Sequence, residues 1–222
     1  TITCFYRMYL SLERNKMNPI EKIEKEKVFA VLRMQNTWKV KQVINALYEG
    51  GIRVVELIID TPEMVGVIEE ITKKEERPLI MAGGIITQRQ AQIAINSGAD
   101  VIVSPVFQMN LVRLCKSQKI PLIMTATTPN EAYSAWMART QLIKISPANP
   151  MGGAEYIEDI LRPMKFLNVI AAGSIKPDDI PAYLSAGVKA VGIGRGLYQN
   201  ADLAEITQRA KDACQKVSEF QK

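Results

Sequence analysis

The chain has 222 residues, of which 47% are hydrophobic and 23% are charged, with 13 glycines and 11 prolines. These proportions exclude a disordered, collagen-like or disulfide-dense protein, and the length suits one large α/β domain or two small ones. The sequence contains no histidine, which excludes a Ser/His/Asp triad, a histidine-bound zinc and an imidazole acid or base. Proton transfer near pH 7 must therefore use a carboxylate, a lysine, water or a substrate phosphate.

The net charge is mildly positive, at +5 from 28 basic and 23 acidic residues. Opposite charges alternate in residues 21–27, which is typical of a solvated helix face. A nucleic-acid interface would carry a stripe of one sign with interleaved aromatic residues, and only 6% of the residues are aromatic. We therefore expect no nucleic-acid partner, whereas anionic small molecules are suitable ligands.

Cysteine usage and hydropathy indicate the compartment. Cys4, Cys115 and Cys214 are scattered and form no CxxC motif, which favours a reducing environment and argues against a thiolate metal site. No window is apolar and long enough for a signal peptide or a membrane span. We expect a cytoplasmic protein with no membrane partner, whose residues 1–16 form a loosely ordered extension; a mitochondrial transit peptide is the alternative.

Short apolar runs alternate with longer amphipathic stretches from Val28 onward. Eight runs begin 20 to 26 residues apart, an interval that fits one strand, one helix and two short loops. Continuous apolar runs with helical crossovers are typical of parallel strands that are buried on both faces. The runs are Val28–Leu32, Ile52–Ile59, Pro78–Met81, Val101–Val103, Pro121–Met124, Leu142–Ile145, Asn168–Ala171 and Ala190–Ile193.

Helix boundaries punctuate the stretches between these runs. Thr61-Pro62-Glu63 is typical of a helix start, and Gly51, Gly98 and Gly187 stand where a helix would end in the left-handed conformation. An open doubly wound sheet could accommodate eight units, but their regularity favours a closed (β/α)8 TIM barrel, which we predict as a single domain over residues 17–222. A helix over residues 19–27 would cap the bottom of the barrel.

Two charged residues interrupt strands that should be apolar. Glu56 lies within the second run and Lys144 within the sixth, both near the C-terminal ends, where barrels carry their active sites. Burial favours the neutral amine of a lysine, which is the nucleophilic form. The structural alternative is an ion pair that crosses the barrel without chemistry. We favour the catalytic interpretation because an unused buried charge is costly.

Glycine-rich loops follow the seventh and eighth runs. In barrels these loops commonly bind phosphate through backbone N–H groups, so we predict a phosphate site there. Tight turns that need small residues are the alternative. Thr125, after the fifth run, is predicted to offer its hydroxyl to substrate, although this threonine cluster also suits capping of the helix at Pro129. The predicted phosphate-binding residues are Gly173, Ser174, Gly194 and Arg195.

Several motifs together resemble the class I aldolases for 2-keto-3-deoxy-6-phosphogluconate and 4-hydroxy-2-oxoglutarate. The resemblance runs in order from about Val28 to Tyr198; its Glu and Lys motifs are specific, whereas its glycine loops are not. The motifs are the segments 49–56, 98–105, 143–149 and 172–175. The resemblance implies a homotrimeric (β/α)8 lyase that releases pyruvate from a 2-keto acid without a metal or another cofactor.

In this resemblance Lys144 matches the Schiff-base lysine and Glu56 matches the proton-transferring carboxylate. Lys144 would attack the C2 ketone to give an iminium that accepts the electrons of the C3–C4 bond. Glu56 would relay the protons, through a water molecule. The predicted substrate-binding residues are Arg33, Gly83, Gly84, Thr125, Ser146 and Pro147.

The chain departs from the family pattern at its substrate contacts. Asp60 stands where the family usually has an arginine for the pyruvyl carboxylate, and Gly84 replaces a threonine. Arg33 is the best remaining cation, although it would equally suit a salt bridge to Glu56 or Asp60. The other departures are Ser146 for an aromatic residue, Ala172 and Ser174 in the usual Thr-Gly-Gly, and Arg195 for a serine. We therefore expect weak activity or an altered substrate.

Three alternatives to the aldolase remain open at this point. The first is another phosphosugar-binding barrel, an isomerase or synthase, which would form no imine. The second is a metal-dependent aldolase or decarboxylase that uses Glu56 and Asp60, which ranks low because the carboxylates are few and no histidine accompanies them. The third is a degenerate barrel that binds ligand without turnover.

Overall fold

A computed structural model describes residues 17–34 and 36–221, so the expectation for residues 1–16 lies outside the described part. Eight parallel strands form a closed barrel in the order β1 to β8, and the last strand pairs with the first. The strands are β1 (Val28–Leu32), β2 (Val54–Ile58), β3 (Leu79–Gly83), β4 (Val101–Ser104), β5 (Leu122–Ala126), β6 (Ile143–Ile145), β7 (Val169–Ala172) and β8 (Val191–Ile193). The predicted TIM barrel is confirmed.

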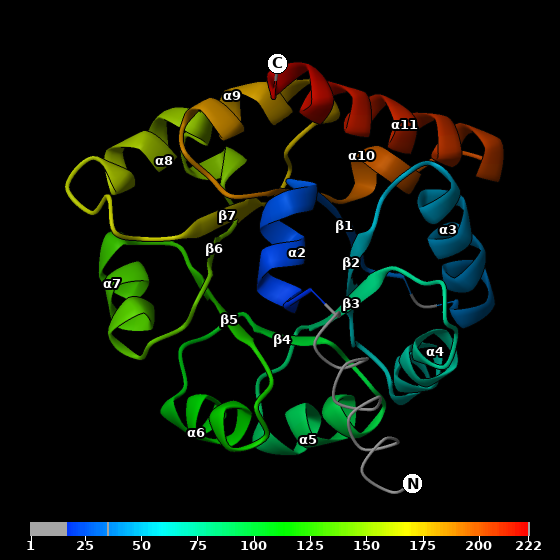
Figure 1. The fold of residues 1–222 in the computed structure, drawn as a ribbon, viewed down its shortest axis with the longest axis horizontal. Coiled ribbons are helices and arrows are strands. Elements are labelled where there is room, and N and C mark those ends of the chain that lie inside the picture. Colours follow the sequence, from blue (N-terminus) through cyan, green and yellow to red (C-terminus); the bar gives the residue numbers. More distant parts are fainter. Residues whose placement is uncertain (1–16, 35, 222) are drawn as a thin grey trace, which may run out of the picture.

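Helices surround the barrel and connect consecutive strands (Figure 1). The α-helices between strands are α3 (Thr37–Glu49), α4 (Pro62–Thr72), α5 (Gln88–Asn96), α6 (Met109–Ser117), α7 (Pro129–Met137), α8 (Gly153–Leu161) and α9 (Ile180–Ser185). After β8 come α10 (Arg195–Tyr198) and α11 (Leu203–Phe220), and two 3-10 helices, η1 (Asn149–Met151) and η2 (Pro177–Asp179), lie in the loops after β6 and β7. Within the described residues, no helix is both long and apolar enough to span a membrane.

The predicted capping helix is α2 (Pro19–Glu26), which lies over the barrel axis in Figure 1. Asn18 accepts a hydrogen bond from the Ile20 N–H, and Pro19 occupies the first helical turn, so the helix has a strong start. Its buried residues Ile20 and Ile23 belong to the same hydrophobic cluster as the inward-facing strand residues. The helix therefore closes the N-terminal end of the barrel, and the C-terminal ends of the strands are left for the site.

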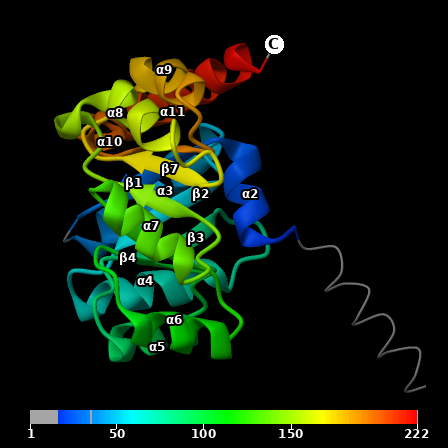
Figure 2. The same cartoon turned by 90° about the vertical axis from the view of Figure 1, so that its left-hand side faces the viewer.

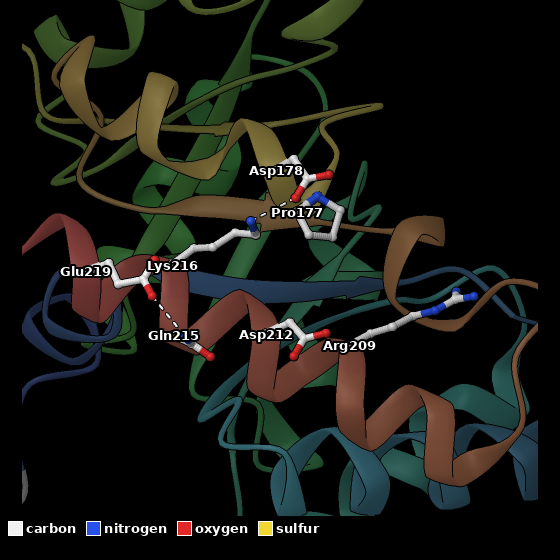
Figure 3. Close-up of a pocket in the computed structure, with 7 residues that line it drawn as sticks. All are labelled: Pro177, Asp178, Arg209, Asp212, Gln215, Lys216 and Glu219. Carbon is white, nitrogen blue, oxygen red and sulfur yellow. Dashed lines mark hydrogen bonds and ion pairs between the residues drawn. The ribbon is translucent and has the colours of Figure 1, made fainter.

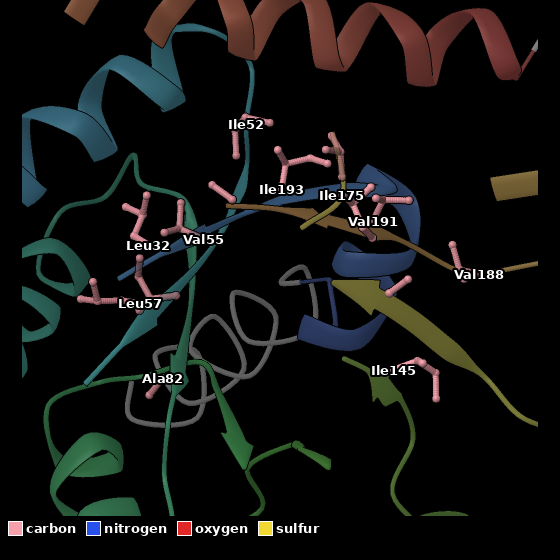
Figure 4. Close-up of a cluster of buried hydrophobic side chains, with 14 of the residues drawn as sticks. Leu32, Ile52, Val55, Leu57, Ala82, Ile145, Ile175, Val188, Val191 and Ile193 are labelled. Atoms are coloured by element: carbon pink, nitrogen blue, oxygen red, sulfur yellow. The ribbon is translucent and has the colours of Figure 1, made fainter. Parts of the chain in front are cut away.

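A second, larger apolar cluster lies between the outer faces of the strands and the helices. Figure 4 shows part of this cluster, in which strand residues such as Leu32, Val55 and Ile193 lie with Ile52 and Ile175 from the connections. A strand that faces apolar residues on both sides has no polar face, which explains the continuous apolar runs in the sequence. Figure 2 shows the same layers from the side, with helices outside the strands.

The predicted glycine signals are confirmed as helix ends. Gly51, Gly98 and Gly187 adopt φ values of +101°, +88° and +101°, in the left-handed region that a side chain would disfavour. At Gly98 a Cβ atom would also lie 2.7 Å from the Thr72 hydroxyl oxygen. These turns end the helices sharply and deliver each chain segment to the N-terminal end of the next strand.

Candidate active site

A buried ion pair crosses the interior of the barrel. Lys144 Nζ donates a hydrogen bond to Glu56 Oε1 at 2.6 Å; Glu56 is fully buried, and Lys144 is 8% exposed. Their strands, β6 and β2, lie four positions apart in an eight-stranded ring, so the two side chains meet from opposite walls. Because removing two charges from water is costly, the ion pair contributes little to the stability of the fold. Its geometry instead places an amine next to a proton acceptor.

Gly83 makes room for the Glu56 carboxylate. A Cβ atom at Gly83 would lie 2.6 Å from Glu56 Oε1 and 2.6 Å from Ile58 Cδ1, closer than real Cβ contacts occur. The next residue, Gly84, has φ +78°, and a Cβ there would lie 3.2 Å from Ile58 Cγ2. Both glycines, which we predicted to contact substrate, lie at the end of β3 beside Glu56. The steric clearance for the carboxylate is a role that sequence reasoning missed.

The threonine cluster after β5 divides into two roles. Thr128 caps α7 in a capping box with Glu131, and Thr127 Oγ1 donates a hydrogen bond to the Ser146 carbonyl oxygen at 3.1 Å. Backbone N–H groups of Thr127 and Thr128 hold the pKa of Glu131 below its usual range. Thr125 belongs to β5 itself and pairs in register with Lys144. The capping role is therefore present on Thr128, and the substrate contact of Thr125 stays a prediction.

Arg33 and Asp60 form an ion pair at the mouth of the barrel. Arg33 Nη1 donates to both Asp60 carboxylate oxygens, at 3.1 and 3.2 Å, which is the salt bridge that we named as an alternative. The Arg33 side chain is 66% exposed, and Asp60 occupies only one of its nitrogen atoms. Because the pair is neutral overall, Arg33 offsets the repulsion that Asp60 alone would exert on a substrate carboxylate.

The loops after β6 and β7 pack tightly against each other. A Cβ atom at Gly173 would lie 2.6 Å from Pro147 Cα, and the Ala148 N–H donates to the Ala172 carbonyl oxygen at 2.8 Å. Ser146 is anchored on the other side, where its N–H donates to the Ala126 carbonyl oxygen at 3.1 Å. Three consecutive strand ends, those of β5, β6 and β7, are thus fixed beside Lys144.

The predicted phosphate residues lie on adjacent strand ends. Ala172 pairs with Gly192 in the β7–β8 register, which brings Gly173 and Ser174 to the same edge as Gly194 and Arg195. Ser174 has φ +56°, and Gly194 is the N-cap of the short helix α10. The side chains of Ser174 and Arg195 are exposed. The predicted residues are therefore neighbours at the mouth of the barrel.

Tyr198 makes a contact with the end of β1 that sequence reasoning missed. Its hydroxyl lies 3.4 Å from both the backbone N and the carbonyl oxygen of Arg33, and so joins α10 to the end of β1. The signal in the sequence was slight, since one tyrosine after a glycine loop is not distinctive. The contact links the predicted phosphate region to the predicted carboxylate region.

Other reactive groups lie away from this mouth. Burial raises the pKa of the Cys115 thiol to about 11, so it is not a thiolate at neutral pH. In the described part of the chain, no three Cys, Asp or Glu side chains gather as metal ligands would. The pocket in Figure 3 lies on the outer surface beside α11 and η2, where Lys216 Nζ bonds Asp178 at 2.8 Å. Glu56 and Lys144 are therefore the candidate reactive groups at the mouth of the barrel.

Comparisons with known proteins show which proteins this chain is similar to. A curated 2-dehydro-3-deoxy-phosphogluconate aldolase from Haemophilus influenzae is 26% identical over 75% of this chain and 78% of its own length. A probable 2-dehydro-3-deoxy-6-phosphogalactonate aldolase from Rhizobium meliloti is 26% identical over 90% of this chain and 93% of its own. A solved KDPG aldolase from Legionella pneumophila, with pyruvate captured as a covalent carbinolamine, has a TM-score of 0.79 at 23% identity and covers 88% and 97% of the two chains.

The family model matches almost the whole described domain. It is the model for KDPG and KHG aldolases, and it covers residues 20–211, from the capping helix into α11. This range includes all eight strands and both members of the buried ion pair. The chain belongs to the KDPG and KHG aldolase family.

Proposed function

We propose that this protein is a class I aldolase that cleaves a 2-keto-3-deoxy sugar acid 6-phosphate, or 4-hydroxy-2-oxoglutarate, to pyruvate and an aldehyde. The observation that carries the proposal is the 2.6 Å contact between Lys144 Nζ and Glu56 Oε1 in an otherwise apolar barrel interior. The amine of a buried lysine can attack a ketone once it has given up its proton, and Glu56 is the acceptor within reach.

The first step forms a carbinolamine on Lys144. Transfer of one proton from Lys144 to Glu56 leaves a neutral amine, whose lone pair attacks C2. The electrons of the C=O double bond move onto the C2 oxygen, which takes up the proton that the newly attached nitrogen gives up. Glu56, now a carboxylic acid, then protonates the C2 hydroxyl. The C–O bond breaks, water departs, and the nitrogen lone pair forms the iminium.

The second step breaks the carbon chain. Glu56, again a carboxylate, removes the proton of the C4 hydroxyl; the C3–C4 bond breaks, and its electrons enter the iminium to give an enamine. The aldehyde leaves. The acid form of Glu56 returns its proton to C3, and water hydrolyses the resulting imine to release pyruvate and restore the Lys144 amine. The Glu56 carboxyl group carries out every proton transfer, so it must lie beside Lys144 Nζ.

The two ends of the substrate have separate sites in this proposal. The backbone N–H groups around Gly173, Ser174 and Gly194, with the Arg195 side chain, would bind the phosphate or terminal carboxylate, because amides at a glycine loop and a guanidinium both suit an anion. Arg33 would bind the pyruvyl carboxylate. Its Nη1 is held by Asp60, and its remaining N–H groups point to no other partner among the described residues.

We expect Arg33→Met to raise KM for 2-keto-3-deoxy-6-phosphogluconate by about 10- to 100-fold, the value of a lost charge-assisted hydrogen bond. Methionine keeps the apolar stem, so kcat should change less. Arg162→Met, whose arginine lies in an exposed pair on the outer surface, is the matched control and should match wild type. Steady-state pyruvate release measures both constants, and an unchanged KM in Arg33→Met would assign Arg33 to the salt bridge alone.

The substrate is identified by comparing wild type, Asp60→Arg and Arg195→Ser on the two candidate keto acids in buffer with EDTA. If Arg33 already supplies the carboxylate contact, Asp60→Arg gives no gain on either substrate. A gain would instead mean that Asp60 weakens binding and that the altered-specificity expectation is correct. Arg195→Ser should raise KM for both substrates, and more for the phosphorylated one, because a phosphate carries more negative charge than the terminal carboxylate of 4-hydroxy-2-oxoglutarate.

The proposal includes a homotrimer, which the family resemblance implies. Four apolar side chains, three on adjacent loops and one at the start of α6, support a subunit interface: Ile86, Val106, Phe107 and Met109 are 39 to 45% exposed. The Gln108 side-chain amide donates to the Ile86 carbonyl oxygen at 2.7 Å and joins the two loops. We expect sedimentation to give a trimer at micromolar concentration and Phe107→Asp to give smaller species, because a charge in an apolar interface is costly. A monomeric wild type would contradict this.

A cytoplasmic location is part of the same proposal. Cys115 and Cys214 are free thiols, which is typical of proteins in a reducing compartment. Fractionation of cells that express the untagged chain tests the location, and recovery in the soluble fraction is the expected result.

A further inference from the structure

One hydroxyl group beside Lys144 has no use in the fold. Thr125 Oγ1 is buried, and no described residue forms a hydrogen bond with it. The hydroxyls of the neighbouring Thr127 and Thr128 are both engaged, with the Ser146 carbonyl oxygen and with the first turn of α7. Leaving a buried hydroxyl unpaired costs about 1–3 kcal/mol. A valine would fill the same volume without that cost, so the hydroxyl at position 125 does not serve stability.

The hydroxyl faces the reacting centre. Thr125 and Lys144 are register partners on adjacent strands, which lie about 4.8 Å apart in a sheet. Two residues earlier on each strand, Ile123 and Leu142 belong to the interior cluster. Because side chains alternate along a strand, Thr125 and Lys144 also point into the barrel. The Thr125 hydroxyl is therefore beside the atom that would be joined to the substrate.

A second unpaired polar atom lies on the other side of the same amine. Glu56 Oε1 accepts the hydrogen bond from Lys144, whereas Glu56 Oε2 is buried and has no partner among the described residues. Thr125 belongs to the strand next to Lys144, and Glu56 to the opposite wall. Both unpaired groups thus face the interior of the barrel, into which Lys144 also points.

We propose that the Thr125 hydroxyl donates a hydrogen bond to the C2 oxygen of the 2-keto acid while Lys144 attacks C2. The inference rests on the proposed Schiff-base function and adds a group that contacts the reacting atoms. As the Nζ–C2 bond forms, the C=O electrons move onto oxygen, and a donor at that oxygen stabilises the growing charge. Glu56 supplies the proton with which this oxygen leaves as water, and Thr125 keeps its own proton throughout.

The departures from the family pattern agree with this role. The usual threonines at the ends of β3 and β7 are Gly84 and Ala172 in this chain, so two hydroxyls are missing from the mouth of the barrel. Thr125 places one hydroxyl at the end of β5 instead, on the strand beside Lys144. In the proposed role, Thr125 would therefore supply from β5 a hydroxyl contact that these two positions do not offer.

The test measures the rate of imine formation with pyruvate. The reaction is quenched with borohydride at timed intervals, and the reduced adduct is quantified by mass spectrometry of the intact protein. Thr125→Val should form the adduct about 10- to 100-fold more slowly, the loss expected for one hydrogen bond to a charged oxygen. Thr125→Ser should recover most of the rate. The rate of deuterium uptake at the pyruvate methyl group should also be measured and divided by the fraction of protein present as the imine. This rate per imine should be the same in Thr125→Val as in wild type, because the C2 oxygen has already left when the enamine forms.

Thermal unfolding separates this role from a structural one. Thr125→Val removes an unpaired hydroxyl and should unfold at the same temperature as wild type or higher. The matched control is Thr72→Val, because Thr72 Oγ1 bonds the carbonyl oxygens of Ile68 and Ser97 at 2.9 and 3.0 Å, far from the mouth. This control should unfold at a lower temperature and form the imine at the wild-type rate.

The outcomes separate the two proposals. If Thr125→Val and Thr125→Ala form the imine as fast as wild type, the hydroxyl does not contact the C2 oxygen, and the Schiff-base function stands. If Thr125→Val is slow but also unfolds at a lower temperature, as Thr72→Val does, the hydroxyl serves the fold and the inference is overturned. If wild type forms no adduct at all, the proposed function itself fails.

Discussion

Lys144→Ala should lower aldol cleavage by about 10⁴- to 10⁶-fold, the order expected when a covalent nucleophile is removed. The reason is that Lys144 is the amine in contact with Glu56. The Cys115 thiol does not replace it as a nucleophile, because burial keeps this thiol in its neutral form. Coupled measurement of pyruvate release gives the rate. The variant should also accumulate no adduct with pyruvate and borohydride.

Loss of the amine also affects stability, because Glu56 is fully buried and keeps no partner on either oxygen. Removing one member of a buried pair costs on the order of 3–5 kcal/mol, and protonation of the freed carboxyl reduces this cost. Lys144→Met, which keeps the apolar stem, should be more stable than Lys144→Ala and equally inactive. Substantial cleavage by a folded Lys144→Met protein would remove Lys144 from the mechanism.

Glu56→Gln should slow turnover by about 10²- to 10⁴-fold, the usual range for a general acid or base. The amide oxygen can still accept the hydrogen bond from Lys144, so the barrel interior keeps its packing, but it cannot take up and return protons. Imine formation with pyruvate should continue slowly, since Lys144 remains. Single-turnover kinetics separates the slow proton transfers from binding.

The control for the Glu56 variant is a second glutamate of the barrel mouth. Glu131 accepts hydrogen bonds from the backbone N–H groups of Thr127 and Thr128 and caps α7. Glu131→Gln should therefore lower the unfolding temperature while turnover per folded molecule stays the same. Glu56→Gln with a near wild-type rate would reassign the buried carboxylate to a structural role.

The strands and the barrel could be predicted because burial on both faces leaves a plain record in the sequence. The run Val28–Leu32 matches β1 residue for residue, whereas Ile52 and Ile59 lie outside β2. Ile52 donates its N–H to the Leu47 carbonyl oxygen at the end of α3, so it closes a helix before the strand begins. An apolar run in the sequence marks buried residues, and buried residues extend one or two positions beyond the hydrogen-bonded part of a strand.

The buried charges could also be predicted, since Glu56 and Lys144 are charged residues within otherwise apolar runs. The sequence alone leaves the contact between Glu56 and Lys144 as one alternative, because the spacing of residues does not determine which side chains meet across a closed barrel. The same limit hid the steric role of Gly83 and the contact of Gly173 with Pro147, and it left Asp60 as one of two possible partners of Arg33. Each depends on a distance between residues far apart in the chain, which only the closed barrel determines.

The most direct test of the central claim is reduction of the wild-type protein with borohydride in the presence of pyruvate, followed by peptide mapping. The account predicts one irreversible pyruvate-derived adduct per chain, located on Lys144, and no adduct without pyruvate. The absence of an adduct, or an adduct on another lysine, would contradict the Schiff-base mechanism.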